Sequence, residues 1–84
     1  MTKILYFARL KQIVGRGEDE IDIPASVKTV SGLIEFLKGR DEGAAHAFSD
    51  LRVVRAAVDQ SHVQLDAPIA GAREIAFFPP VTGG

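Results

Sequence analysis

The sequence predicts one small α+β domain. Short runs of strand-forming residues lie near both ends of the chain, at residues 3–9 and 74–78. Between them, residues 29–39 show the spacing of apolar side chains that marks an amphipathic helix. A chain of 84 residues without cysteine is near the lower size limit for folding without disulfides or metals. These observations favour a sheet covered by one main helix.

The first two predicted strands lie close together in the sequence. Residues 3–9, KILYFAR, form the first strand, and the glycines of the following LKQIVGRG mark a turn. Residues 18–24, EDEIDIP, alternate between acidic and apolar side chains, which predicts a half-buried strand that ends at Pro24. Ile21 and Ile23 face inward in this interpretation, and the acidic stretch is a solvated strand edge that discourages edge pairing.

The predicted helix follows the second strand. Thr29 is its expected N-cap and Gly39 its expected end. Four apolar residues form one stripe at i, i+3, i+4 and i+7: Val30, Leu33, Ile34 and Leu37. The next segment, RDEGAAHAFSD, leaves a short second helix open as an alternative to a loop.

Three further strands complete the pattern. RVVRAAVDQ and HVQLD predict a hairpin that turns at residues 59–61, APIAGARE is a loop, and EIAFF is the last strand. The resulting order is β-β-α-β-β-β. If the first and last strands pair in the middle of a mixed sheet, the helix packs across one face, which is the ubiquitin-like β-grasp arrangement. The pattern alone leaves this as one candidate among small α+β folds.

The alternation within strands separates two sets of aromatic residues. We expect Phe7 and Phe78 to share the outer face of the sheet with His62, and exposed neighbouring aromatics usually mark a protein partner. The alternative is that both phenylalanines are buried under a loop. The helix-facing core is expected to contain Ile4, Tyr6, Ile21, Ile23, Leu33, Leu37, Ile75 and Phe77.

Charge and composition argue against several functions. Ten basic and eleven acidic residues give a net charge of −1, so no polycationic surface is expected for nucleic acid or anionic lipid. The apolar runs are too short to cross a bilayer, and we expect a cytoplasmic protein. His46 and His62 lack metal-ligand spacing, and Gly15-Arg16-Gly17 is a turn rather than a phosphate loop. No motif isolates a catalytic serine, so we expect no active site within this chain.

The chain ends in FFPPVTGG, and we expect a folded domain, with the β-grasp as the candidate fold, over residues 1–78 and a flexible tail over residues 79–84. Pro79 and Pro80 have no N–H, so they cannot extend the sheet, and they favour an extended backbone. Only glycine lets a backbone enter a slot with no Cβ in the way. A terminal carboxylate is an anion at neutral pH and a poor electrophile, so it must be activated before it carries a group. The structural alternative is that a terminus tolerates any residue.

FFPPVTGG, together with KILYFARLKQIVG and AAVDQ, closely resembles the sulfur-carrying small subunits of molybdopterin synthase, which are ubiquitin-related proteins. The resemblance runs from end to end and is sharpest over residues 74–84. The chain differs from the family pattern at Asp59, where members often carry Asn, and at AGARE, where the turn is commonly acidic.

The resemblance implies a β-grasp fold and a sulfur-transfer function in molybdenum cofactor biosynthesis. An E1-like enzyme would use ATP to adenylate Gly84, which then becomes a thiocarboxylate. The tail of Pro79, Pro80, Val81, Thr82 and Gly83 would enter the large subunit of a heterotetramer of two small and two large subunits. There the sulfur would pass to the cyclic pyranopterin precursor. We expect the side chains that strand alternation places on the outer face, Phe7, His62 and Phe78, to contact the large subunit. The chain itself would bind no cofactor or metal.

Two other functions use the same tail chemistry. One is a ubiquitin-like modifier that is conjugated to lysines through Gly84. The other is a sulfur carrier for thiamine synthesis or tRNA thiolation. The diproline after paired aromatics favours the molybdopterin synthase interpretation.

Overall fold

The first and last strands of the chain pair at the centre of the sheet. The structure, a computed structural model, describes residues 1–80. β1 (Thr2–Tyr6) and β5 (Glu74–Phe78) run parallel, with Ile4 opposite Ile75 and Tyr6 opposite Phe77. The sheet order is β2-β1-β5-β3-β4. The predicted central pairing is therefore confirmed.

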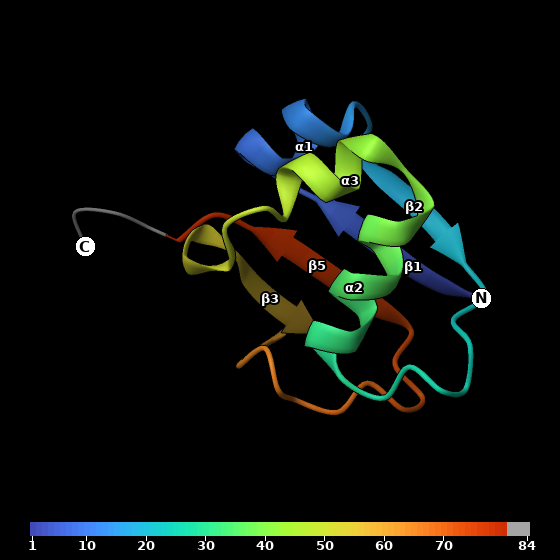
Figure 1. Ribbon diagram of the computed structural model, residues 1–84. Coiled ribbons are helices and arrows are strands. Elements are labelled where there is room, and N and C mark those ends of the chain that lie inside the picture. Colours follow the sequence, from blue (N-terminus) through green and yellow to red (C-terminus); the bar gives the residue numbers. More distant parts are fainter. Residues whose placement is uncertain (81–84) are drawn as a thin grey trace.

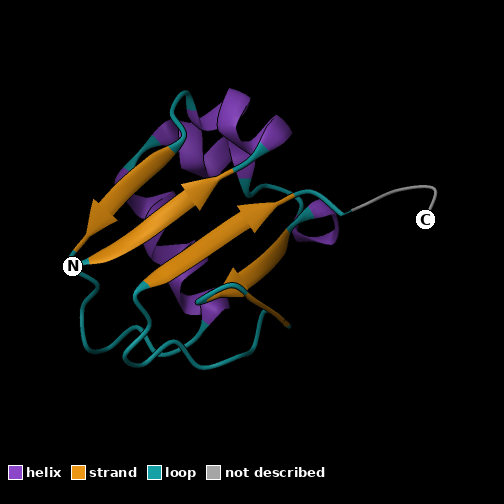
Figure 2. Ribbon diagram, turned by 180° about the vertical axis from the view of Figure 1, so that it is seen from behind, coloured by secondary structure: helices purple, strands orange, loops and turns teal. Residues whose placement is uncertain are grey.

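The other three strands pair antiparallel to their neighbours. They are β2 (Glu18–Ile21), β3 (Arg55–Val58) and β4 (Ser61–Val63). Figures 1 and 2 show that the helices gather on one face of this mixed sheet and leave the other face open. The helical segments are α1 (Ala8–Val14), α2 (Val30–Arg40), α3 (Glu42–Ala47) and the short 3₁₀ segment η1 (Leu51–Val53). The predicted α+β fold, with its main helix on one face of a mixed sheet, is confirmed.

Helix α1 was not predicted and corrects the first strand. β1 ends at Tyr6 rather than Arg9, and α1 takes in the last two residues of the predicted strand and the first part of the segment that was interpreted as a turn. Its signal was present, because Leu10 and Val14 are buried one helical turn apart. Gly15 does not simply mark a turn, because it caps this helix with φ 92° and its N–H donates to the Lys11 carbonyl at 2.9 Å.

Helix α2 begins as predicted, since the Thr29 hydroxyl accepts a hydrogen bond from the Gly32 N–H. Its predicted end at Gly39 is wrong. The helix continues through Arg40, and Asp41 both ends α2 and caps α3, the short second helix that the sequence left open. α3 lies close to the end of α1. A Cβ atom added at Gly43 in α3 would lie only 3.0 Å from the carbonyl oxygen of Val14 in α1.

The β3–β4 hairpin is shorter than predicted at both ends. Arg52 and Val53, the first two residues of the predicted strand, belong to η1 instead, and β4 ends at Val63. The turn falls at Asp59 and Gln60, which have φ angles of 48° and 72°, as a type I′ turn requires. Asp59 Oδ1 also accepts the N–H groups of Arg73 and Glu74 at 2.9 and 3.0 Å. The side-chain oxygen of Asn, which family members often carry at this position, could accept the same two hydrogen bonds. Asp59 therefore keeps this contact although it departs from the family pattern.

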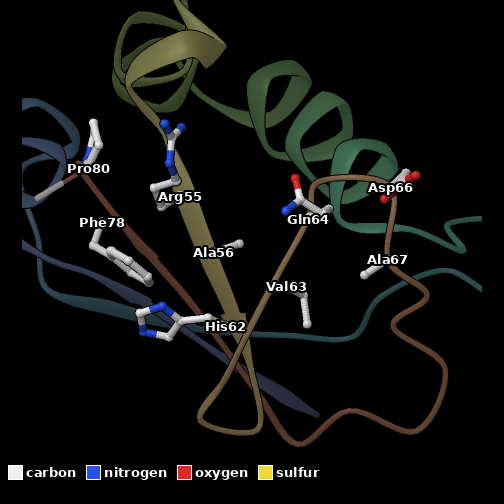
Figure 3. A pocket seen from close by; sticks show the side chains of 9 residues that line it. All are labelled: Arg55, Ala56, His62, Val63, Gln64, Asp66, Ala67, Phe78 and Pro80. Atoms are coloured by element: carbon white, nitrogen blue, oxygen red, sulfur yellow. The ribbon is translucent and has the colours of Figure 1, made fainter.

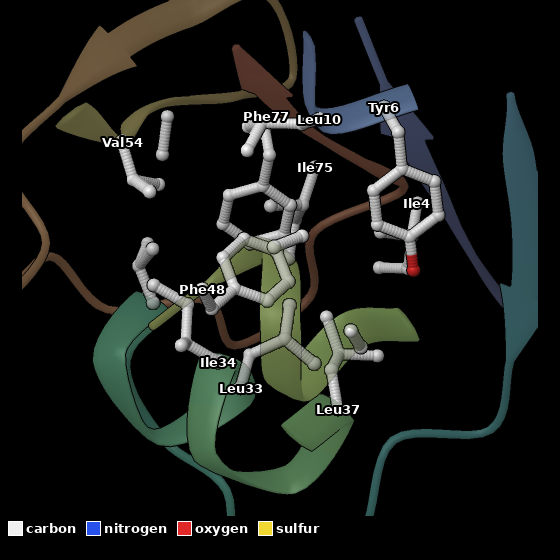
Figure 4. Close-up of a cluster of buried hydrophobic side chains, with 14 of the residues drawn as sticks. Ile4, Tyr6, Leu10, Leu33, Ile34, Leu37, Phe48, Val54, Ile75 and Phe77 are labelled. Carbon is white, nitrogen blue, oxygen red and sulfur yellow. The ribbon is translucent and has the colours of Figure 1, made fainter. Parts of the chain in front are cut away.

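The core lies between the sheet and the helices, as Figure 4 shows. Phe77 is fully buried and packs edge-on against Phe48, with ring centroids 4.9 Å apart and planes at 71°. Ile23 is only half-buried, because β2 ends at Ile21 and the alternation stops there. The other seven predicted core residues are buried: Ile4, Tyr6, Ile21, Leu33, Leu37, Ile75 and Phe77.

An ionic network ties the sheet to the helical layer. The Tyr6 hydroxyl donates to Asp19 Oδ2 at 2.9 Å, and Arg16 Nε donates to Asp19 Oδ1 at 2.7 Å. Arg16 Nη2 donates to Asp41 Oδ2 at 2.7 Å, while Asp41 Oδ1 accepts the Ala44 N–H at 2.7 Å. Within the acidic stretch that was expected to be solvated, Asp19 is therefore engaged in the fold.

The network shifts the pKa of each of its acidic groups. Hydrogen bonds from Arg16 hold the pKa values of Asp19 and Asp41 below their usual range. Burial, followed by the bond to Asp19, raises the pKa of Tyr6 far above its ordinary value. The lowered carboxylate pKa values mean that this part of the stability is present above about pH 4, the unfolded Asp pKa, and is lost as the pH falls further.

Phe77→Ala should lower the free energy of unfolding by about 3–5 kcal/mol, because it leaves a cavity in the core. Phe78 is half-buried on the outer face, so Phe78→Ala should cost only about 1 kcal/mol. Urea unfolding of both variants measures the difference. A larger loss for Phe78→Ala would place the core on the other face of the sheet.

Arg16→Gln should lower the free energy of unfolding by about 1 kcal/mol at pH 7, since both of its ion pairs are partly solvent-screened. The difference from the wild type should shrink as the pH falls below about 4 and through the lowered pKa values of the folded carboxyl groups, because their protonation removes the ion pairs. Denaturant unfolding across this pH range measures the effect. A difference that stays constant with pH would show that Arg16 stabilises the fold by packing rather than by charge.

Candidate functional site

The chain leaves the centre of the sheet at the end opposite the N-terminus (Figure 1). β5 ends at Phe78, where the predicted tail begins, and Pro79 and Pro80 follow as half-buried residues. Pro80 borders two grooves, one involving the outer side of the sheet and one on the helical side. The base of the tail is therefore flanked by concave surface on both sides.

The outer groove has a volume of about 700 Å³ and includes Arg55, His62, Phe78 and Pro80 in its lining. Figure 3 shows His62 and Phe78 pointing toward one another, with Arg55 and Pro80 at one end of the groove. The His62 and Phe78 rings have centroids 5.1 Å apart and planes tilted by 46°. His62 is exposed and Phe78 is half-buried, so the pair presents an aromatic surface to solvent.

The groove on the helical side has a volume of about 380 Å³. Its lining includes Arg9 and Ile13 on α1, Val53 on η1, and both prolines. Ile13 is half-buried and packs against the core, whereas Val53 is 47% exposed. This groove places apolar side chains from two separate elements beside the prolines.

Exposed apolar residues gather around the prolines. Phe7 is 48% exposed, and its N–H donates to the Phe77 carbonyl at 3.0 Å, which holds it beside the end of β5. We define the tail-base patch as Phe7, Val53, Phe78, Pro79 and Pro80. An exposed apolar patch of this kind is typical of a surface that contacts another protein.

The residues that were predicted to contact a partner lie at this end of the molecule, but they do not all contact one another. His62 and Phe78 are in contact, as expected from the sequence. Phe7 is exposed as predicted, and among residues 1–80 no aromatic ring pair joins it to Phe78. Val53 was missed because RVV was interpreted as the start of a strand, whereas η1 leaves this side chain exposed. Val81, Thr82, Gly83 and Gly84 lie outside the described residues.

Charged side chains surround the tail-base patch. Arg9, Arg52 and Arg55 are exposed, and Arg52 is paired with Asp50 through Nε–Oδ1 at 3.0 Å. Over residues 1–80, no cluster of three or more His, Asp or Glu side chains could hold a metal ion. No helix in the same range has the length and hydrophobicity needed to cross a membrane.

Comparison with known proteins supports a relationship along the full chain. The molybdopterin synthase sulfur carrier subunit of Escherichia coli K12 is 38% identical over 84 residues, which cover 100% of both chains. A solved structure from Pyrococcus furiosus, provisionally described as molybdopterin converting factor subunit 1, has a TM-score of 0.73 and 32% identity, with 95% of this chain and 97% of that chain covered.

The SAMP1 structure from Haloferax volcanii has a TM-score of 0.71 and 25% identity, and the match covers 99% of this chain and 98% of that chain. Finally, residues 4–84 match the ThiS family. The match includes most of β1, all of β5, every helix of the described structure and the glycine-ended tail. The chain belongs to the ThiS family.

Proposed function

We propose that this chain is the sulfur carrier subunit of a molybdopterin synthase and that Gly84 carries the sulfur as a C-terminal thiocarboxylate. The observation that carries the proposal is the similarity over all 84 residues to the Escherichia coli sulfur carrier subunit. The β-grasp fold and the tail-base patch support it, because both suit a protein that presents its tail to a partner.

The chemistry follows from the low reactivity of a carboxylate. The Gly84 carboxylate attacks the α-phosphorus of ATP on an E1-like enzyme, which gives an acyl-adenylate and releases pyrophosphate. Sulfur at the oxidation level of hydrosulfide then displaces AMP from the acyl-adenylate and gives the thiocarboxylate. On the large subunit the thiocarboxylate sulfur bonds to the cyclic pyranopterin precursor, and hydrolysis of the acyl–sulfur bond leaves the sulfur on the precursor and returns the Gly84 carboxylate. This chain supplies the carrier, and its partners supply the catalytic groups.

The sequence of the tail suits entry into a narrow site. Pro79 and Pro80 stiffen the base of the tail and cannot pair with a strand. Gly83 and Gly84 have no side chains, so a slot around them can approach the backbone closely. Val81 and Thr82 connect these two parts. From Pro80 to Gly84 the tail reaches at most about 16 Å when extended, which is enough to pass below a protein surface.

The tail-base patch is the proposed contact with the large subunit, in a heterotetramer of two small and two large subunits. Phe78 and His62 provide aromatic surface on one side of the tail, and Phe7 provides it beside the end of β5. Aromatic side chains that become buried at the centre of an interface commonly contribute most of the affinity. A partner that covers this patch would hold the tail in its direction of entry.

A protein modifier is the second candidate function. It is favoured by the similarity to the SAMP1 structure, a protein also described as small archaeal modifier protein 1. Such a modifier would form an isopeptide bond between Gly84 and a lysine. The intact mass of the protein purified from its own cells separates the two functions. Replacement of one oxygen by sulfur supports the carrier, and isopeptide-linked ladders support the modifier.

Deletion of Gly84 should abolish sulfur transfer and leave the thermal unfolding curve unchanged, because β5 already ends at Phe78. Precursor conversion in a reaction with the activating enzyme and the large subunit measures the activity. A variant with one residue added after Gly84 is the matched control for tail length. It should be equally inactive, because the terminal carboxylate then belongs to the added residue. Activity in the deletion variant would exclude Gly84 as the carrier.

Phe78→Ala should weaken binding to the large subunit by about 30-fold, the loss that corresponds to about 2 kcal/mol at an interface. Isothermal titration with the purified large subunit measures the affinity. Phe36→Ala is a suitable control, because Phe36 is also half-buried but lies on α2, away from the tail. Equal losses of affinity in the two variants would remove Phe78 from the proposed interface.

A further inference from the structure

Arg55 lies beside the base of the tail. It is the first residue of β3 and pairs with Phe78 in the sheet register. It also lines the outer groove with His62, Phe78 and Pro80. Figure 3 shows its guanidinium at the end of the groove near Pro80, pointing away from His62. A partner that receives the tail must therefore pass close to this side chain.

The backbone holds the Arg55 guanidinium in place. Nη1 donates to the Val54 carbonyl at 3.0 Å and to the Arg52 carbonyl at 3.2 Å. A guanidinium has five N–H donors, and three of them belong to Nε and Nη2. Within residues 1–80, Nε and Nη2 of Arg55 have no hydrogen-bond partner. Nε and Nη2 together form the planar edge that binds a carboxylate through two parallel hydrogen bonds.

Two other arginines show which groups bind the Nε–Nη2 edge elsewhere in this protein. Arg52 donates from Nε and Nη2 to the two carboxylate oxygens of Asp50, at 3.0 and 3.1 Å. Arg16 donates from Nε to Asp19 and from Nη2 to Asp41, both at 2.7 Å. In each case this chain supplies the carboxylate. Arg55 has the same edge, already oriented, without such a partner in the described part of the chain.

We propose that the Nε–Nη2 edge of Arg55 binds a carboxylate side chain of the protein that receives the tail. The inference rests on the proposed function, because it is tail entry that brings a protein surface to Arg55. The charge at this end supports an acidic partner. Arg9 lines the helical-side groove and Arg55 the outer groove, and Asp50 is paired with Arg52. Asp66, which also lines the outer groove, lies on the far side of it from Arg55 in Figure 3. The net charge of −1 for the whole chain argues against a polyanion such as nucleic acid.

This contact would set orientation as well as affinity. Because Nη1 is already bound to two carbonyls, a carboxylate on the opposite edge can approach from one direction only. The neighbouring Phe78 and Pro80 would exclude water once covered, and hydrogen bonds strengthen when water is excluded. The pair would thus align the partner with the outer side of the tail.

The test compares three full-length variants in titrations with the purified large subunit. Arg55→Gln should weaken binding about tenfold or more, because it removes both the charge and the bidentate edge. Arg55→Lys restores the charge without the planar edge and should retain about a fivefold loss. Arg73→Gln removes the same charge at the opposite end of β5 and should change affinity by less than about twofold. Melting temperatures of all three should match that of the wild type.

A double-mutant cycle identifies the partner group. Each Asp or Glu around the tail entrance of the large subunit is changed to its amide, and each variant is titrated with the wild type and with Arg55→Gln. One amide variant of the large subunit should bind the wild-type chain more weakly. The same variant should bind Arg55→Gln no more weakly than the unchanged large subunit does. Such a result would assign the bound carboxylate, which a role limited to the fold of this chain would not produce.

Four results would overturn the inference and leave the proposed function intact. Three of them are unchanged binding of Arg55→Gln, a loss no larger than that of Arg73→Gln, and the absence of any coupled carboxylate. A fourth is normal binding to the large subunit with slower adenylation, which would assign the edge to the activating enzyme. If the wild-type chain neither binds the large subunit nor transfers sulfur, the proposed function fails and the inference fails with it.

Discussion

The parallel pairing of β1 with β5 is the constraint on which the rest of the structure depends. It joins residues from the two ends of the chain, so every other element must fit between them in sequence and around them in space. Parallel strands cannot be joined by a tight turn, and the intervening residues form the other three strands and the helical layer. The pairing also places the exit of the tail at the centre of the sheet rather than at an edge.

This central exit explains why the tail-base patch has contributions from distant parts of the sequence. Phe7 follows β1 and precedes α1, Val53 lies in the segment before β3, and Phe78 ends β5. Phe7, Val53 and Phe78 are far apart in sequence, and only Phe78, Pro79 and Pro80 are neighbours along the chain. The patch therefore exists only when the sheet is complete, and a partner that recognises it recognises the folded domain together with its tail.

The sheet and the main helix could be predicted from the sequence because local patterns of apolar residues indicate them. The alternation at Ile21, the stripe that includes Leu33 and Leu37, and the EIAFF run each report a buried face directly. Helix α1 was missed because its glycine was interpreted as a turn rather than as a helix cap. The end of α2 was misplaced for a related reason: Gly39 resembled a stop, whereas Asp41 determines the boundary through its bond to the Ala44 N–H.

The parts of the site that sequence reasoning could not supply depend on distant contacts. Arg16 reaches Asp41, 25 residues away, and no local pattern pairs them. The orientation of Arg55 depends on the Arg52 carbonyl in η1 and on the Val54 carbonyl that follows it, in a segment that was interpreted as a strand. Phe78 and His62 could be assigned to one face by alternation, because a regular strand repeats every two residues.

The buried position of Tyr6 has an optical consequence. The chain contains one tyrosine and no tryptophan, so its near-ultraviolet absorption and emission are dominated by a single ring at the junction of sheet and helices. That ring lies in the core and not in the tail-base patch. Emission excited at wavelengths selective for tryptophan would therefore come entirely from a partner that contains tryptophan, and docking onto such a partner could be followed by fluorescence without a label on either protein.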